Sequence, residues 1–239
     1  MNKFSDFIRR KTAASCSAVV VAAGSSVRMG EDKLFIDLGG KPVLARTLEA
    51  LNGCDCVNEI VVVTRADCLE KVSSLCVEYA INKVTKVVCG GKNRNESALS
   101  GISEIRRDAK VVIIHDGARP FVTEEIVRST VHAAALYKCA APGIPVTDTI
   151  KMAAEDCITG TLDRSRLVAM QTPQAFLPDL IKTALTKAVR DDISYTDDCA
   201  AVEALGAIVH LTEGSPENIK ITRPLDVKLA EAILQCRSH

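Results

Sequence analysis

The sequence predicts an α/β protein with a doubly wound, mainly parallel sheet, from which a β-arm projects. Short continuous apolar runs recur along the chain, as is typical of strands buried on both faces of a parallel sheet. Segments with helical periodicity lie between these runs. Pro and Gly interrupt the alternation at about residues 141–174, where we expect the arm. We therefore expect a lead-in over residues 1–16 and a single domain over 17–235.

The expected strands and helices alternate along the first half of the chain, and the pattern resumes after the arm. The first strand is S-A-V-V-V-A-A at 17–23, and further strands are expected at 60–64, 86–89, 111–115 and 207–211. Three helix starts have favourable residues: Asn95 and Thr123 as N-caps, and Pro224 in a first turn. Helices are expected at 42–51, 69–77, 96–105, 124–137, 177–189, 198–205 and 224–235.

Composition argues against several classes of partner. The 30 basic and 30 acidic side chains cancel, and 3% aromatic residues with no Trp leave few platforms for stacking bases, so we expect no nucleic-acid partner. No apolar run approaches the roughly 18 to 20 residues that span a bilayer, so no membrane partner is expected. The ten cysteines are scattered and lack C-x-x-C spacing, which favours reduced thiols in a cytoplasmic protein.

The loop after the first strand is the first candidate site, because ligands of open parallel sheets bind beyond the carboxyl ends of the strands. Ala22, Ala23 and Gly24 allow a ligand to approach the backbone closely, and Arg28 and Lys33 add two cations. Backbone N–H groups and cations suit a polyphosphate. A tight turn at Gly24 with two solvated cations is the alternative interpretation.

Later motifs give the sequence a family resemblance. A-A-G-x-x-x-R-M at 22–29 is followed by G-G-x-x-R-x-x-S at 90–97, H-D-G-A-R-P at 115–120, P-V-x-D-T-I-K at 145–151, L-D-R at 162–164, T-P-Q at 172–174, T-D-D at 196–198 and N-I-K-I-T-R-P-x-D at 218–226. In this order they resemble the 2-C-methyl-D-erythritol 4-phosphate cytidylyltransferase family over about residues 17–235. The resemblance implies a Rossmann-like sheet of the nucleotide-diphospho-sugar transferase type.

The same resemblance implies a reaction in non-mevalonate isoprenoid biosynthesis, in which Mg²⁺ assists transfer of a cytidylyl group from CTP to an alditol phosphate. Two anions must approach each other, so positioned cations are the essential catalysts. By resemblance, Arg28 and Lys33 stabilise the transition state, and Arg164 and Lys220 hold the attacking phosphate. The nucleotide contacts expected are Ala22, Ala23, Gly24, Gly91, Arg94, Ser97, Asp116 and Gly117, and the acceptor contacts are Arg119, Thr149, Thr196 and Asp197.

Several roles stay open at this level. Asp116 suits a Mg²⁺ ligand, a partner for hydroxyl groups, or the start of a turn. Ser97 suits base recognition or the start of a helix, and Thr196 and Asp197 suit substrate hydroxyls or a helix cap. His115 is expected to be a packed core residue, because an ionised phosphate needs no base.

The sequence leaves three alternative hypotheses about function. A CDP-ribitol pyrophosphorylase would use the same chemistry with another acceptor. A nicotinamide-dependent oxidoreductase would need the G-x-G-x-x-G motif, which is absent. A noncatalytic nucleotide-binding module would not need the four cations. The family's arm packs against a second subunit, so the resemblance also implies a homodimer, although a hairpin packed on its own domain would have a similar sequence.

Overall fold

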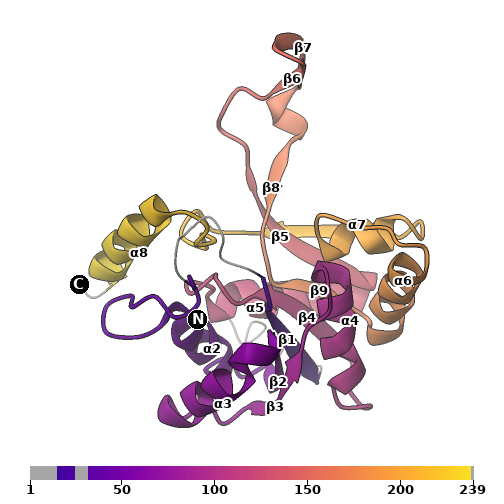
Figure 1. Ribbon diagram of the computed structural model, residues 1–239. Coiled ribbons are helices and arrows are strands. Elements are labelled where there is room, and N and C mark those ends of the chain that lie inside the picture. Colours follow the sequence, from indigo (N-terminus) through magenta and orange to yellow (C-terminus); the bar gives the residue numbers. More distant parts are fainter. Residues whose placement is uncertain (1–14, 25–31, 238–239) are drawn as a thin grey trace, which may run out of the picture.

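The computed structural model describes residues 15–24 and 32–237, which form a mixed sheet between two layers of helices (Figure 1). Six strands of the sheet run in one direction, and β8 and β9 run antiparallel to their neighbours. In spatial order the strands are β10 (His210–Glu213), β5 (Cys139–Pro145), β9 (Gln174–Phe176), β4 (Val111–Asp116), β1 (Cys16–Ala22), β2 (Val57–Thr64) and β3 (Val84–Cys89), with β8 (Val168–Met170) pairing with β5. The predicted α/β class is confirmed.

The strand order reverses beside β1. The chain runs from β1 outward to β2 and β3, and then crosses back to place β4 on the other side of β1. The Gly117 N–H donates a hydrogen bond to the Val21 carbonyl at 3.0 Å. This bond links the residue that follows β4 to the end of β1. A crevice at such a reversal is where open α/β sheets bind ligands.

Alternate residues of the central strands pack against opposite helix layers. On β1, Val20 belongs to one core cluster and Val19 to the other. The first layer consists of α2 (Val43–Asn52), α3 (Leu69–Glu78) and α5 (Glu124–Tyr137), and the second of α4 (Arg94–Glu104), α6 (Pro178–Arg190) and α7 (Asp198–Glu203). The last helix, α8 (Pro224–Arg237), packs against a smaller cluster that contains Phe121 and Ile221.

Helix α4 approaches the sheet more closely than a side chain would allow. A Cβ atom on Gly101 would lie 2.4 Å from Val19 Cγ1 and 2.7 Å from Val63 Cγ2. Packing at this distance excludes even an alanine without a shift of the helix. The close approach holds α4 against β1 and β2.

The arm is shorter than predicted. The expected boundaries at 141–174 were wrong at both ends, because β5, β8 and β9 belong to the main sheet. Only β6 (Lys151–Ala154) and β7 (Cys157–Thr161) form a separate two-stranded sheet, at the tip of an arm that stands away from the body (Figure 1). The arm also includes the short 3-10 turn η2 (Arg164–Arg166).

The other predicted helices and strands are present, with small shifts of their ends. The predicted N-cap of α4 was wrong: Asn93, not Asn95, caps the helix by accepting a hydrogen bond from the Glu96 N–H at 2.9 Å. Asn95 is buried and donates to the Ile193 carbonyl. The final strand begins at His210, later than the expected residue 207. A second 3-10 turn, η1 (Ala66–Cys68), precedes α3.

The cysteine thiols and the apolar character of the helices are two further features of the fold. All ten cysteines are free thiols, and seven of them are buried. Burial raises the pKa of several of these thiols, for example that of Cys76 to about 11, which keeps them protonated and unreactive. Within residues 15–24 and 32–237, no helix has the length and apolar character needed to cross a membrane.

Candidate active site

A cavity of about 410 Å³ lies at the reversal of strand order, beyond the carboxyl ends of β1 and β4. Every nucleotide contact expected from the sequence lines it, together with two of the expected catalytic cations. These lining residues are Ala22, Ala23, Gly24, Lys33, Gly91, Arg94, Ser97, Asp116, Gly117 and Lys220. Segments that are far apart in the sequence therefore meet in one pocket.

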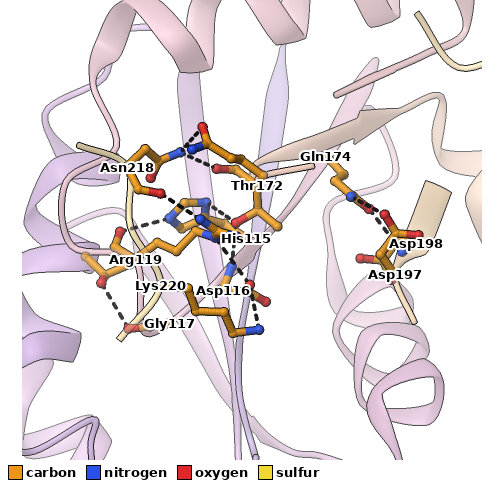
Figure 2. A network of polar contacts seen from close by, with 12 residues as sticks. His115, Asp116, Gly117, Arg119, Thr172, Gln174, Asp197, Asp198, Asn218 and Lys220 are labelled. Carbon is orange, nitrogen blue, oxygen red and sulfur yellow. Dashed lines mark hydrogen bonds and ion pairs between the residues drawn. The ribbon is translucent and has the colours of Figure 1, made fainter. Parts of the chain in front are cut away.

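Asp116, the last residue of β4, is a carboxylate with cationic side chains gathered around it (Figure 2). Its Oδ2 atom lies 2.9 Å from Lys220 Nζ and 3.5 Å from Arg119 Nε, and its Oδ1 atom lies 3.6 Å from Arg94 Nη2. Burial would raise the pKa of Asp116, but the charges of Lys220, Arg94 and Arg119 outweigh it and hold the pKa well below its usual range. Asp116 is therefore ionised at neutral pH.

Backbone contacts bring Lys220 to this carboxylate. The Ile221 N–H donates to the Ala118 carbonyl at 2.9 Å, which fastens the segment before α8 to the loop after β4. Arg119 Nη1 donates to the Asn218 carbonyl at 2.6 Å, and the Asn218 side-chain amide donates to the Thr172 carbonyl at 2.9 Å. These bonds join three of the sequence motifs into one network (Figure 2).

His115 supports Asp116 from inside the core. His115 Nε2 lies 3.2 Å from the Arg119 carbonyl, which can only accept, so Nε2 is the donor. In a neutral ring Nδ1 then accepts from the Thr172 hydroxyl at 3.0 Å, and that hydroxyl accepts from the Asp116 N–H at 3.1 Å. Burial lowers the pKa of His115 to about 4, so the ring is neutral and both of its nitrogen atoms are engaged. It is a packed core residue, as expected.

The turn that leads into α4 requires its glycines. A Cβ atom on Gly90 would lie 2.6 Å from Ala23 Cβ, and one on Gly91 would lie 2.2 Å from Glu96 Cβ. The Ser97 hydroxyl accepts from the Gly91 N–H at 3.1 Å and donates to the Asn93 carbonyl at 2.8 Å. These bonds stabilise the start of α4 beside Gly91 and Arg94, and base recognition by Ser97, which lines the cavity, stays a prediction.

Sequence reasoning missed a pair that secures Lys33. Arg65 directly follows β2, and its Nη2 atom lies 2.7 Å from Asp32 Oδ2. Asp32 Oδ1 in turn accepts from the Leu34 N–H at 3.3 Å. The pair therefore ties the backbone on both sides of Lys33 to the carboxyl end of β2. The available signal was the position of Arg65 at a strand end on the functional edge of the sheet.

Some expected site residues lie away from the cavity. Thr149 and Arg164 are exposed on the arm, where Arg164 Nη1 donates to the Thr147 carbonyl at 2.9 Å. Thr196 is exposed, and Asp197 takes the helix-cap role, since its Oδ1 atom accepts from the Ala200 N–H at 2.9 Å. Arg28 lies outside the described residues.

The side chains of the cavity suit a metal ion that enters with a ligand better than an ion that the protein holds by itself. No group of three or more His, Cys, Asp or Glu side chains that could hold a metal converges within residues 15–24 and 32–237. Asp116 is the carboxylate that lines the cavity, and Mg²⁺ in nucleotide sites is commonly held by one or two carboxylates together with substrate phosphates and water. The cavity therefore fits Mg²⁺ bound to a polyphosphate.

A doubly wound sheet with a cation-lined cavity at its reversal point defines the chain as an α/β protein whose site suits an anionic ligand. Comparison with known proteins is more specific. The chain belongs to the 2-C-methyl-D-erythritol 4-phosphate cytidylyltransferase family, whose model matches residues 16–236. The enzyme class expected from the resemblance, a nucleotidyltransferase, is confirmed.

Relatives of this name cover nearly the whole chain. The 2-C-methyl-D-erythritol 4-phosphate cytidylyltransferase of Caldanaerobacter subterraneus is 45% identical over 223 residues, which are 92% of this chain and 98% of the relative. That of Clostridium novyi is 44% identical over 225 residues, 91% of this chain and 96% of the relative. The crystal structure of 4-diphosphocytidyl-2C-methyl-D-erythritol synthase from Anaerococcus prevotii matches with a TM-score of 0.83 at 30% identity, covering 98% of this chain and 100% of that chain.

His115 predicts a pH dependence of folding stability. Its pKa is lowered to about 4 in the folded protein from an ordinary value of 6.5. Between these pH values the unfolded chain binds more protons, so stability is lost as the pH falls through this window, by about 3 kcal/mol in total. We expect His115→Gln to lose this part of the slope in urea unfolding measured at pH 7 and pH 4.5.

The exposed His132 provides the matched control. The His132→Gln variant is expected to keep the wild-type difference in unfolding free energy between the two pH values. An unchanged difference in His115→Gln would contradict the assignment of a buried neutral ring.

Proposed function

We propose that this protein transfers the cytidylyl group of CTP to 2-C-methyl-D-erythritol 4-phosphate, forming 4-diphosphocytidyl-2-C-methyl-D-erythritol and pyrophosphate in isoprenoid biosynthesis. The observation that carries the proposal is the meeting of Lys33, Arg94 and Lys220 around one cavity in a member of this family. Each comes from a different part of the chain, and each cation suits a phosphate oxygen.

The reaction needs positioned charge rather than a protein nucleophile. An oxygen of the acceptor phosphate attacks the α-phosphorus of CTP, and the bond from that phosphorus to the pyrophosphate oxygen breaks. The acceptor phosphate is already ionised, so no proton has to be removed. Lys33 stabilises charge that develops along the triphosphate, in company with Arg28, and Lys220 orients the attacking phosphate.

Charge in the described part of the cavity favours this pair of anions. Lys33, Arg94 and Lys220 line the cavity beside Asp116, so cationic side chains outnumber this carboxylate in the described lining. Lys220 is 39% exposed, so it can exchange its contact with Asp116 for a contact with an entering phosphate. The carboxylate that remains is suited to nucleotide hydroxyls or to Mg²⁺.

We also propose that Mg²⁺ enters with the triphosphate and that Asp116 holds it on the protein side. When bound, the ion neutralises phosphate charge. In this arrangement the low pKa of Asp116 is useful, because the carboxylate needs no deprotonation before it contacts a cation.

The arm supports a proposal about assembly. Thr149 and Arg164 are exposed and lie outside the cavity lining, and apolar side chains of the arm are exposed with them, Ile158 at 68% and Met152 at 48%. An exposed apolar arm is suited to packing on a second copy of the chain. The arm of one protomer would then carry Arg164 to the acceptor phosphate of its partner. A cytoplasmic location is proposed from the ten free thiols.

An acceptor assay tests the proposed activity. With CTP and Mg²⁺ present, we expect pyrophosphate release with 2-C-methyl-D-erythritol 4-phosphate and a much lower kcat/KM with ribitol 5-phosphate. A preference for ribitol 5-phosphate would instead support a CDP-ribitol pyrophosphorylase. Absence of release with both acceptors would reject cytidylyl transfer to either of them.

Substitution of the cations tests their division of labour. Lys33→Ala, like Arg28→Ala, is expected to lower kcat by about 10² to 10³, because each removes a preorganised stabiliser of the transition state. Lys220→Ala and Arg164→Ala are expected chiefly to raise the KM for the acceptor. Lys182 is exposed on α6, and Lys182→Ala serves as the control. Wild-type kinetics in all four variants would contradict the assignment.

Mixed dimers test whether the arm acts across subunits. Lys33→Ala and Arg164→Ala chains are each assayed alone at low acceptor concentration, and are then unfolded and refolded together. If Arg164 acts on the partner's site, one of the two sites in each mixed dimer is intact, and the rate recovers to about a quarter of wild type. If Arg164 acts within its own chain, neither site is intact and the mixture stays as slow as its components.

A further inference from the structure

Arg94 lies between two carboxylates of different kinds. Its Nη1 atom is 2.5 Å from Oδ2 of Asp198, which has no exposed side-chain surface, and its Nη2 atom is 3.6 Å from Oδ1 of Asp116 at the cavity. The two distances differ by more than an ångström, so the guanidinium is drawn toward the buried carboxylate and away from the cavity carboxylate.

Asp198 has little other electrostatic support. Apart from the contact with Arg94, neither of its carboxylate oxygens has a hydrogen-bond partner among the described residues. Burial raises its pKa, Arg94 opposes that effect, and the nearby anions Asp116 and Asp197 add to it. A buried carboxylate without hydrogen bonds is costly and persists only with a charged partner. Arg94 is that partner.

The backbone of Asp198 is held firmly in place. The Gln174 side-chain carbonyl accepts from the N–H groups of Asp198 and Cys199, both at 3.0 Å, and the Gln174 amide donates to Asp197 Oδ2 at 2.7 Å. Figure 2 shows Gln174, Asp197 and Asp198 grouped to one side of the Asp116 network. This anchoring means that Asp198 sets the position of Arg94, because the carboxylate has little freedom to follow the longer side chain.

The attraction of Arg94 to Asp198 leaves one oxygen of Asp116 without a close partner among the described residues. Lys220 and Arg119 contact its Oδ2 atom, whereas within the described part of the chain Oδ1 has only Arg94, at a distance beyond a hydrogen bond. Without the attraction of Asp198, the guanidinium would close the gap and occupy Oδ1.

We propose that Asp198 is a positioning residue of the nucleotide site: its ion pair with Arg94 holds the guanidinium off Asp116 and keeps Oδ1 of Asp116 open to a polar group of the nucleotide. The inference rests on the proposed use of CTP. In this proposal Asp198, the second aspartate of T-D-D, affects nucleotide binding through Arg94 and does not contact the nucleotide.

The test is the isosteric variant Asp198→Asn, assayed by pyrophosphate release. We expect the KM for CTP to rise about tenfold, with kcat at saturating CTP within about twofold of wild type, because binding rather than chemistry is disturbed. Glu59→Gln is the matched control, since Glu59 is a buried carboxylate at the far end of β2 that accepts from the Ser17 hydroxyl and the Arg106 N–H. Its KM for CTP is expected to stay at the wild-type value.

A double-mutant cycle separates positioning from a general loss of structure. In an Arg94→Ala background, Asp198→Asn is expected to cause no further rise in the KM for CTP, because the residue through which Asp198 acts is gone. Thermal unfolding of each variant fixes an assay temperature at which all are folded. The double variant has lost both charges of the pair, so it carries no uncompensated buried charge.

The outcomes are distinct. A KM for CTP unchanged in Asp198→Asn, or a rise of equal size with and without Arg94, would overturn the inference while leaving the proposed activity intact. Failure of the wild-type protein to release pyrophosphate would instead overturn the proposed function, and the inference with it.

Discussion

The ionised carboxylate of Asp116 is the point on which the organisation of the site depends. It ends a central strand, and cations from three separate segments, Lys220, Arg94 and Arg119, gather around it. Removing one member of a buried charged pair typically costs about 3–5 kcal/mol, because the partner is left uncompensated. The same cluster that ties the last segment and α4 to the end of β4 therefore also concentrates positive charge where a polyphosphate would bind. Stability of the fold and attraction of an anion have a common origin here.

The sheet makes this cluster possible. Strand order reverses beside β1, and the cavity lies at this reversal, beyond the carboxyl ends of β1 and β4. Glycines let the surrounding backbone close in: Gly101 brings α4 onto the sheet, and Gly90 and Gly91 allow the turn before it to pack against Ala23 and Glu96. The cavity walls are thus backbone and small side chains, whereas its charges come from long side chains anchored behind them.

Within one chain the cavity holds cations for a nucleotide, while Arg164 stands on an exposed arm. The proposed homodimer accounts for this separation, since a second copy could supply Arg164 where the acceptor phosphate enters. Asp198 illustrates a different kind of indirect contribution. It is buried behind Arg94, and its proposed effect reaches the nucleotide only through the place at which it holds that guanidinium.

The sequence predicted the alternation of strands and helices, the loops at the carboxyl ends of the strands, and the family, because periodicity and motif order can be read along the chain. It also predicted ten of the residues that line the cavity. The folded structure shows contacts of the predicted site residues that the sequence does not: Ser97 braces a turn, Asp197 caps a helix, and Arg94 lies between Asp116 and Asp198. It also decided that β5, β8 and β9 join the main sheet, since β8 and β9 are three residues long and β5 contains Pro and Gly, so none has a readable pattern. Contacts between distant segments bury side chains, and this burial shifts their pKa values and decides which groups they bond. Such contacts cannot be read from the residues next to them in the sequence.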